Sequence, residues 1–320
     1  MKQITRRATT TVPNSSTSSH SPSEVGAAIE QFQIEYPLGT DNLRSLVRQT
    51  EYVPPPNDPR PTMSPHRLIE DVVVPELTVL YDEYSFITAK DASLTDERQR
   101  DTGSPQQQHS NDNDSLVYGE IDLQGFCTLL REIIDRPTAA ASSVTTAALS
   151  SSGGIFYDLG SGSGRAVFAA RFVGDYSTCI GLELLANLHG LASAVHSLYK
   201  VCYAPKLQHR GVQFIETDLL DYDWSDGTVV YIPNLLFDPG MLQQIATQAT
   251  KLQRGAYVLS LKKLGSVNAT TDDHEENTTE EACGCSFQDA FELLRQQVVT
   301  MSWGDSTVYI YQRRWLEERV

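Results

Sequence analysis

The sequence predicts an α/β protein with a mostly parallel sheet, helices on both faces and an antiparallel strand pair at one edge. From Ile155 onwards, short apolar runs typical of strands alternate with longer helical patterns. Such alternation is typical of parallel strands that are connected by helices. Near the end of the chain, the runs VVTMSW and STVYIYQ follow each other with no helical pattern between them. This closeness indicates an antiparallel pair.

The composition is that of a globular protein. The chain has 320 residues, of which 40% are hydrophobic, and a formal net charge of −16. This length allows one large domain or two small ones with a buried core. The negative charge disfavours strong direct binding to nucleic acid or to an anionic membrane.

The cysteines and the apolar runs exclude other classes. The five cysteines form no CxxC pair and no set with metal-ligand spacing, so we expect no metal site and a reducing compartment. We find no run of about 18 apolar residues and no apolar segment near the first residue. Neither a membrane span nor a secretory signal is therefore expected.

The first third of the chain predicts a small helical region, residues 24–115, behind a disordered tail, residues 1–23. The tail is rich in Ser, Thr and Pro. A helix is expected at about 24–36, a Pro-rich extended linker at 50–65, and helical spacing follows in HRLIEDVVVPELTVLYDEYSFI, broken or kinked at Pro75.

A polar segment, residues 91–115, is expected to be a flexible insertion because it offers few side chains for a core. Beyond it, residues 116–320 are expected to form the main domain, with an acidic loop at about 265–285. This domain begins with a helix at LQGFCTLLREII. The runs IFYDL, TCIGLEL, VQFIETD, TVVYIP and AYVLSL are predicted strands, and AVFAARFV, ANLHGLASAVHSLYK, PGMLQQIATQATKL and SFQDAFELLRQ are predicted helices.

The loop after the first strand predicts a ligand site. Gly160, Gly162 and Gly164 follow the strand that ends near Asp158. In open parallel sheets ligands bind at the carboxyl ends of the strands, and bare glycines let a ligand approach the backbone. The spacing is GxGxG rather than the GxGxxG of dinucleotide sites, and Asp158 would repel a diphosphate. The ligand should therefore be uncharged or cationic at this point.

Two further acids follow later strands. Glu183 ends the next strand, roughly 20 residues on, where an acid can accept both ribose hydroxyls. Asp218 ends a third strand and could meet an adenine edge, with Leu219 packing on the ring. An adenosine with a positive neighbour and no phosphate is S-adenosyl-L-methionine. The run DLGSGSG resembles the first motif of the seven-strand, Rossmann-like methyltransferases, and GLE and TDLL resemble later ones.

A narrower resemblance begins at LVYGEIDLQGF. This run resembles the YGE signature of the disruptor of telomeric silencing (DOT-one) family, the non-SET histone lysine methyltransferases of the histone H3 lysine-seventy-nine type. The runs VVYIPNLLFDP, RGAYVLSL and MSWGDSTVYIY resemble later family motifs, in the family's order, over about residues 116–311. The resemblance implies contacts with the cofactor from Tyr118, Gly119, Glu120, Ile121, Phe156, Asp158, Leu159, Gly160, Ser161, Gly162, Ser163, Gly164, Arg165, Glu183, Asp218 and Leu219.

The reaction needs a lysine channel. Methyl transfer from a sulfonium is an in-line displacement, so it depends on positioning in a water-poor channel. An apolar channel also lowers the pKa of the lysine, which must lose its proton. Our candidates for the channel wall are Phe237, Trp303 and Tyr309, and our candidate for orienting the amine is Asn234.

Two features depart from the family pattern. Pro233 stands where the family tends to have Asn, with Asn234 one place later, and proline must end the preceding strand at Ile232. The stretch from Leu264 to Leu294 holds several acids and no Lys or Arg, where relatives usually carry a basic segment for the nucleosome.

The leading hypothesis is a protein lysine methyltransferase that acts in the nucleus. Its expected substrate is a histone or another basic protein, and the histone could be part of a nucleosome. Two alternatives stay open. One is a methyltransferase of a non-histone protein or small molecule, in the cytoplasm for example. The other is a cofactor-binding scaffold without turnover.

Overall fold

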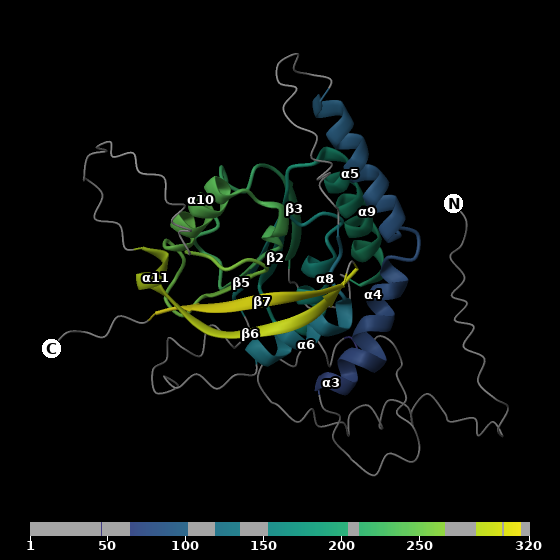
Figure 1. Ribbon diagram of the computed structural model, residues 1–320. Coiled ribbons are helices and arrows are strands. Elements are labelled where there is room, and N and C mark those ends of the chain that lie inside the picture. The colour runs from purple at the N-terminus through teal and green to yellow at the C-terminus, as the bar shows by residue number, and fades with distance from the viewer. Residues whose placement is uncertain are drawn as a thin grey trace, which may run out of the picture.

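The fold is built on one seven-stranded sheet in the order β3-β2-β1-β4-β5-β7-β6. The computed structural model describes residues 65–101, 119–134, 153–203, 211–265, 286–302 and 304–314, together with Leu46. Figure 1 shows α10 and α11 on one side of the molecule and α4, α5 and α9 on the other.

The strands are β1 Ile155–Leu159, β2 Thr178–Glu183, β3 Gly211–Glu216, β4 Val229–Ile232, β5 Tyr257–Ser260, β6 Phe291–Met301 and β7 Gly304–Arg313. The helices are α3 Pro65–Leu68, the π-helical turn η1 Ile69–Val73, α4 Val74–Leu80, α5 Phe86–Asp101, α6 Leu123–Ile134, α8 Arg165–Val173, α9 Ala186–Cys202, the 3₁₀ turn η2 Asn234–Leu236, α10 Pro239–Ala249 and α11 Phe287–Ala290.

The sheet confirms the predicted fold class. β1 to β5 pair in parallel, whereas β7 pairs antiparallel with both β5 and β6. A doubly wound dinucleotide fold would run 3-2-1-4-5-6. Here β7 lies between β5 and β6, so the sheet ends in the predicted antiparallel hairpin. The strand order reverses at β1, between β2 and β4, which is where such sheets bind ligands.

The sheet buries a hydrophobic core on each face. One face is covered by α6, α8 and α9, and the other by α10 and α11. The core of the first face also contains buried side chains of η1 and α4, such as Val72 and Leu77. The N-terminal helices therefore share one core with the sheet. Among the described residues, no helix is long and apolar enough to cross a membrane.

The helical region is not broken at Pro75: the helix continues through this residue, with a π-helical turn just before α4. α3, η1 and α4 follow one another, and Pro75 lies in the first turn of α4. Proline lacks an N–H and its ring crowds the carbonyl of the preceding turn, and the wider π-helical turn lies directly before it. The expected tail, the helix at 24–36, most of the linker at 50–65 and the acidic loop at 265–285 lie outside the described residues.

The expectation of a flexible insertion at 91–115 is wrong for its first part. Residues 86–101 form α5, and Ala89 and Ser93 on it are buried. α5 lies beside α9 (Figure 1). The helix carries almost no apolar periodicity, and the two buried residues described on it, Ala89 and Ser93, are small. Residues 102–115 lie outside the described part of the chain.

The expected helix at SFQDAFELLRQ is also largely wrong. α11 covers only Phe287–Ala290, and the chain then continues as the long strand β6. β6 pairs with β7 along its whole length, with a β-bulge between Leu293 and Arg295. Pairing with β7 overrides the helical propensity of this run, because the side chains of a paired strand pack against the neighbouring strand.

An aromatic cluster joins the N-terminal helices to α8, α9 and β3. The ring of Phe168 contacts those of Tyr81, Tyr199 and Phe214, and the half-buried His196 lies 5.7 Å from Phe214 between ring centroids. Burial, and secondly the charge of Lys200, lower the pKa of His196 to about 4.

This shifted pKa predicts a loss of stability in acid. In the unfolded chain the pKa of histidine is about 6.5, so between pH 6.5 and 4 the unfolded state takes up a proton that the folded state does not. The free energy of unfolding should therefore fall as the pH falls through this window. A His196→Phe variant should show a smaller fall, as measured by urea unfolding at pH 7 and pH 5. Equal falls in both proteins would contradict this assignment.

Candidate functional site

The glycine loop between β1 and α8 lies at the point where the strand order reverses. Gly160, Gly162 and Gly164 all have positive φ angles, of 95°, 52° and 87°. L-residues with side chains rarely adopt this conformation. The N–H groups of Gly160 and Ser161 donate to the carbonyl of Leu182, at 2.8 and 2.9 Å. The end of β2 therefore holds the loop in place.

Glu183, the last residue of β2, fixes the same loop through its side chain. Its Oε2 accepts from the N–H of Gly162 at 2.7 Å, and its Oε1 accepts from the N–H of Leu185 at 2.8 Å. The carboxylate is buried, and two charge-assisted bonds of this kind orient it firmly. A carboxylate oxygen can accept more than one hydrogen bond, so this side chain can hold the loop and contact a ligand as well.

Asp158 presents an incompletely paired carboxylate beside Glu183. Only 2% of its surface is exposed, and its Oδ1 has no hydrogen-bond partner among the described residues. Burial, and secondly the charge of Glu183, raise the pKa of Asp158 well above its usual range. A buried acid in this state is stabilised by a positive ligand or by a hydrogen-bond donor.

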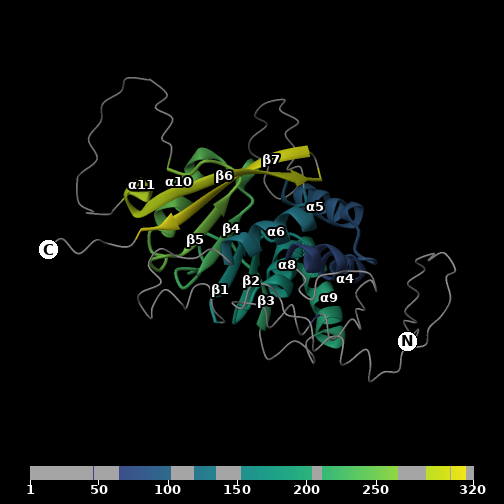
Figure 2. The ribbon, with the colours of Figure 1, turned by 90° about the horizontal axis from the view of Figure 1, so that it is seen from below.

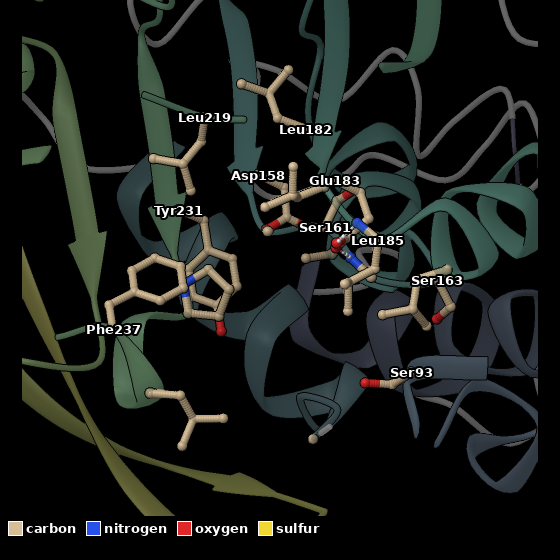
Figure 3. Close-up of a pocket in the computed structure, with 18 of the residues that line it drawn as sticks. Ser93, Asp158, Ser161, Ser163, Leu182, Glu183, Leu185, Leu219, Tyr231 and Phe237 are labelled. Atoms are coloured by element: carbon tan, nitrogen blue, oxygen red, sulfur yellow. Dashed lines mark hydrogen bonds between the residues drawn. The ribbon is translucent and has the colours of Figure 1, made fainter. Parts of the chain in front are cut away.

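These groups line a cavity of about 360 Å³ at the carboxyl ends of the strands. Figure 3 shows Asp158, Glu183 and Ser161 grouped together, with Tyr231 and Phe237 to one side of them. The volume lies within the range of about 300–1,000 Å³ that is typical of small-molecule sites.

Most of the predicted site residues lie at this cavity. Those that line it are Gly119, Glu120, Ile121, Asp158, Gly160, Ser161, Gly162, Ser163, Arg165, Glu183, Asp218, Leu219 and Phe237. Phe156 and Leu159 instead pack into the cores on the two faces of the sheet, and Gly164 lies against the ring of Phe214. Tyr118 and Trp303 lie outside the described residues.

The structure corrects the expectation that Asn234 faces the reacting amine. The residue is fully buried. Its Nδ2 donates to the Oγ of Ser260, and its Oδ1 accepts from the N–H of Lys262, both at 2.8 Å. The amide therefore ties the turn after β4 to the end of β5 and to the residues just after it, and it does not line the cavity.

Of the other described residues predicted for the channel wall, one lines the cavity and one does not. Phe237 and Pro233 line the cavity and lie beside Gly160. Tyr309, on β7, packs against the core on the α10 face and does not line it. β4 ends at Ile232, directly before Pro233, as the missing N–H of proline predicts.

Sequence reasoning missed several lining residues, among them Ser93, Leu182, Leu185, Leu188, Thr217, Tyr231 and Met241. One sequence feature points to Tyr231: it lies two residues before Pro233, near the carboxyl end of a buried strand. It is the register partner of Asp158 across β1 and β4. Ser93 had no such signal, because it comes from α5 in the segment that was expected to be flexible.

The turn between α4 and α5 also holds the glycine loop from outside. The hydroxyl of Tyr81 donates to the carbonyl of Ser163 at 2.9 Å, and the guanidinium of Arg165 lies 4.3 Å from the centre of the Tyr81 ring. Arg165 Nη2 also reaches the carbonyl of Tyr84 at 3.4 Å. The site is therefore completed by residues far from it in the sequence.

The residues at the cavity fit S-adenosyl-L-methionine. Burial and the charge of Glu183 raise the pKa of Asp158, so a cationic ligand is the partner that would favour its ionised form, and the left-handed loop leaves the backbone open to close approach. Asp218 and Leu219 line the cavity on the side of β3. This fold and this set of residues define an S-adenosyl-L-methionine-dependent methyltransferase.

The family model for the histone methylation protein DOT1 matches residues 113–312, more than half of the chain. The chain therefore belongs to the DOT1 family, and it is a methyltransferase of the histone lysine type. A search of curated proteins gave no significant match.

Solved methyltransferase structures resemble parts of the chain. An RNA methyltransferase from Salinibacter ruber in complex with S-adenosyl-L-homocysteine is 24% identical, with a TM-score of 0.33, and the match covers 58% of this chain and 98% of that one. The M1A22 tRNA methyltransferase of B. subtilis is 11% identical, with a TM-score of 0.36, over 61% and 66% of the two chains.

Glu183→Ala should weaken S-adenosyl-L-methionine binding at least tenfold, or about 1.4 kcal/mol. The substitution removes the acceptor that fixes the N–H of Gly162 and the negative charge beside Asp158. Glu216→Ala is the matched control, because Glu216 is exposed and is the register partner of Glu183 on β3. Calorimetric titration should separate the two variants, and equal affinities would refute the site.

Asn234→Ala should lower stability by about 1–3 kcal/mol, because the partly buried N–H of Lys262 and the buried Oγ of Ser260 each lose a partner. Cofactor affinity should change less than twofold in the protein that remains folded. Denaturant unfolding and calorimetric titration measure the two effects. Unchanged stability together with a large loss of turnover would restore Asn234 to a direct role in the reaction.

Proposed function

We propose that this protein transfers a methyl group from S-adenosyl-L-methionine to a lysine side chain in the core of a histone, with histone H3 as the candidate. The single observation that carries the proposal is the composition of the cavity. A pair of buried carboxylates adjoins a wall of largely apolar residues, Ile121, Pro233, Leu236, Phe237 and Met241.

Each part of this cavity has a proposed task. When bound, the cofactor supplies a methyl group on a sulfonium, and the carboxylate of Asp158 accepts its positive end. Glu183 accepts from ribose hydroxyls while it holds the glycine loop, and Asp218 and Leu219 contact the adenine. The apolar wall around Phe237 excludes water and lowers the pKa of the incoming lysine, which favours the neutral amine that can act as a nucleophile.

Tyr231 is our candidate for orienting that amine. The amide of Asn234 is engaged elsewhere, and Pro233 offers no side-chain polar group. The hydroxyphenyl group of Tyr231 lines the cavity beside Asp158, and burial and the charge of Asp158 raise the pKa of this hydroxyl well above its usual range. A phenol that stays protonated can accept an N–H of the amine while it keeps its own proton.

A histone substrate also bears on where the protein acts in the cell and on how it recognises its substrate. Histones are basic and this chain carries a net charge of −16, so attraction between the two is favourable. We place the protein in the nucleus, where its substrate is assembled with DNA. The same charge disfavours strong direct contacts with the DNA, so recognition rests on the histone surface.

Pro233 favours one second candidate. A cofactor-binding protein whose reaction loop has changed would keep the glycine loop and lose the group that orients the amine. Such a protein would bind S-adenosyl-L-methionine and methylate no histone, or it would act on a non-histone protein or a small molecule.

Incubation with labelled S-adenosyl-L-methionine and nucleosomes, free histones or a cell lysate separates these functions. We expect label on a histone, with nucleosomes the better substrate. Tyr231→Phe should lower turnover at least tenfold with less than a twofold change in cofactor affinity, because the lost contact is made to the amine. Label on other lysate proteins alone, or cofactor binding without any transfer, would contradict the histone proposal.

A further inference from the structure

The tip of the β6–β7 hairpin is hydrogen-bonded to the loop that carries Glu120. Ile121 and Met301 form an isolated antiparallel bridge. The N–H of Asp122 donates to the carbonyl of Thr300 at 3.1 Å, and the N–H of Ser302 donates to the carbonyl of Glu120 at 2.8 Å. The hairpin thus extends the sheet by a short pairing with a segment about 180 residues earlier in the chain. Figure 2 shows the hairpin reaching across to the side of α5 and α6.

Ser302 adds a side-chain contact to this pairing. Its Oγ accepts from the N–H of Glu120 at 3.0 Å, so Ser302 holds both backbone polar groups of that residue. Ser302 is exposed and does not line the cavity, whereas Glu120 does. The contact therefore links a surface residue of the hairpin to the wall of the site.

The side chain of Glu120 passes this link to the glycine loop. One of its oxygens lies 2.7 Å from Nε of Arg165, and the other accepts from the Oγ of Ser163 at 3.3 Å. The side chains of Arg165 and Glu120 are only 17% and 9% exposed. This contact is an ion pair without a hydrogen bond, because Nε of Arg165 has no hydrogen-bond partner among the described residues. Both charges have lost most of their water, so the attraction between them depends on their short separation.

We propose that Ser302 is a positioning residue for the cofactor site, acting through Glu120. The Ser302 hydroxyl fixes the backbone of Glu120, and the carboxylate of Glu120 then holds Arg165 and Ser163 in the glycine loop. The inference rests on the proposed function, since it takes the cavity to be the site of S-adenosyl-L-methionine.

The test compares three hairpin variants by calorimetric titration with S-adenosyl-L-methionine. Ser302→Ala should bind it about fivefold more weakly, whereas Ser302→Thr, which keeps the hydroxyl, should bind nearly as well as the unaltered protein. Ser306→Ala makes the same chemical change on β7 of the same hairpin and should leave the affinity unchanged. Thermal midpoints should be nearly equal in all four proteins.

A double-mutant cycle with Glu120→Ala separates positioning from a general effect on the hairpin. If Ser302 acts through the carboxylate of Glu120, Ser302→Ala should have almost no further effect in the Glu120→Ala background. Full additivity, an unchanged affinity of Ser302→Ala or an equal loss in Ser306→Ala would overturn the inference and leave the proposed function standing. No cofactor binding by the unaltered protein would overturn both.

Discussion

The bond from the N–H of Gly162 to the carboxylate of Glu183 is the interaction on which the site depends. It joins the middle of a loop with three left-handed residues to the end of the neighbouring strand. The same carboxylate accepts a hydrogen bond from the N–H of Leu185, the residue directly before α9. One side chain thus fixes both segments that border the cavity at β1 and β2. Burial, together with the charge of Glu183, makes the ionised form of Asp158 costly without a positive ligand.

Local patterns were enough to predict the parallel strands, the glycine loop and the end of β4. The strands IFYDL and TCIGLE are short and largely apolar runs, and the positive φ angles of the loop follow from glycine itself. β4 ends before Pro233 because proline has no backbone N–H to donate to the sheet, and this cause lies in a single residue. Features of this kind need no knowledge of distant neighbours.

The features that sequence reasoning missed depend on partners far along the chain. ELLRQ forms a strand only because β7 is available to pair with it. The amide of Asn234 turns away from the cavity because Ser260, the last residue of β5, and Lys262, just after it, offer it partners. α5 joins the site through the small residue Ser93, which leaves no apolar pattern to detect. Such contacts become visible only when the sheet order is known.

The β-bulge in β6 has a consequence for the solubility of the folded chain. In the part of the chain that the structure describes, β6 is the last strand of the sheet, so one side of its backbone is open except where its end pairs with Ile121. An open edge of this kind invites pairing with a second chain and the growth of aggregates. The bulge between Leu293 and Arg295 interrupts the regular row of amides, and Arg295, paired with Glu132, places charge beside it. The irregularity in the hairpin therefore guards the sheet against edge-to-edge association.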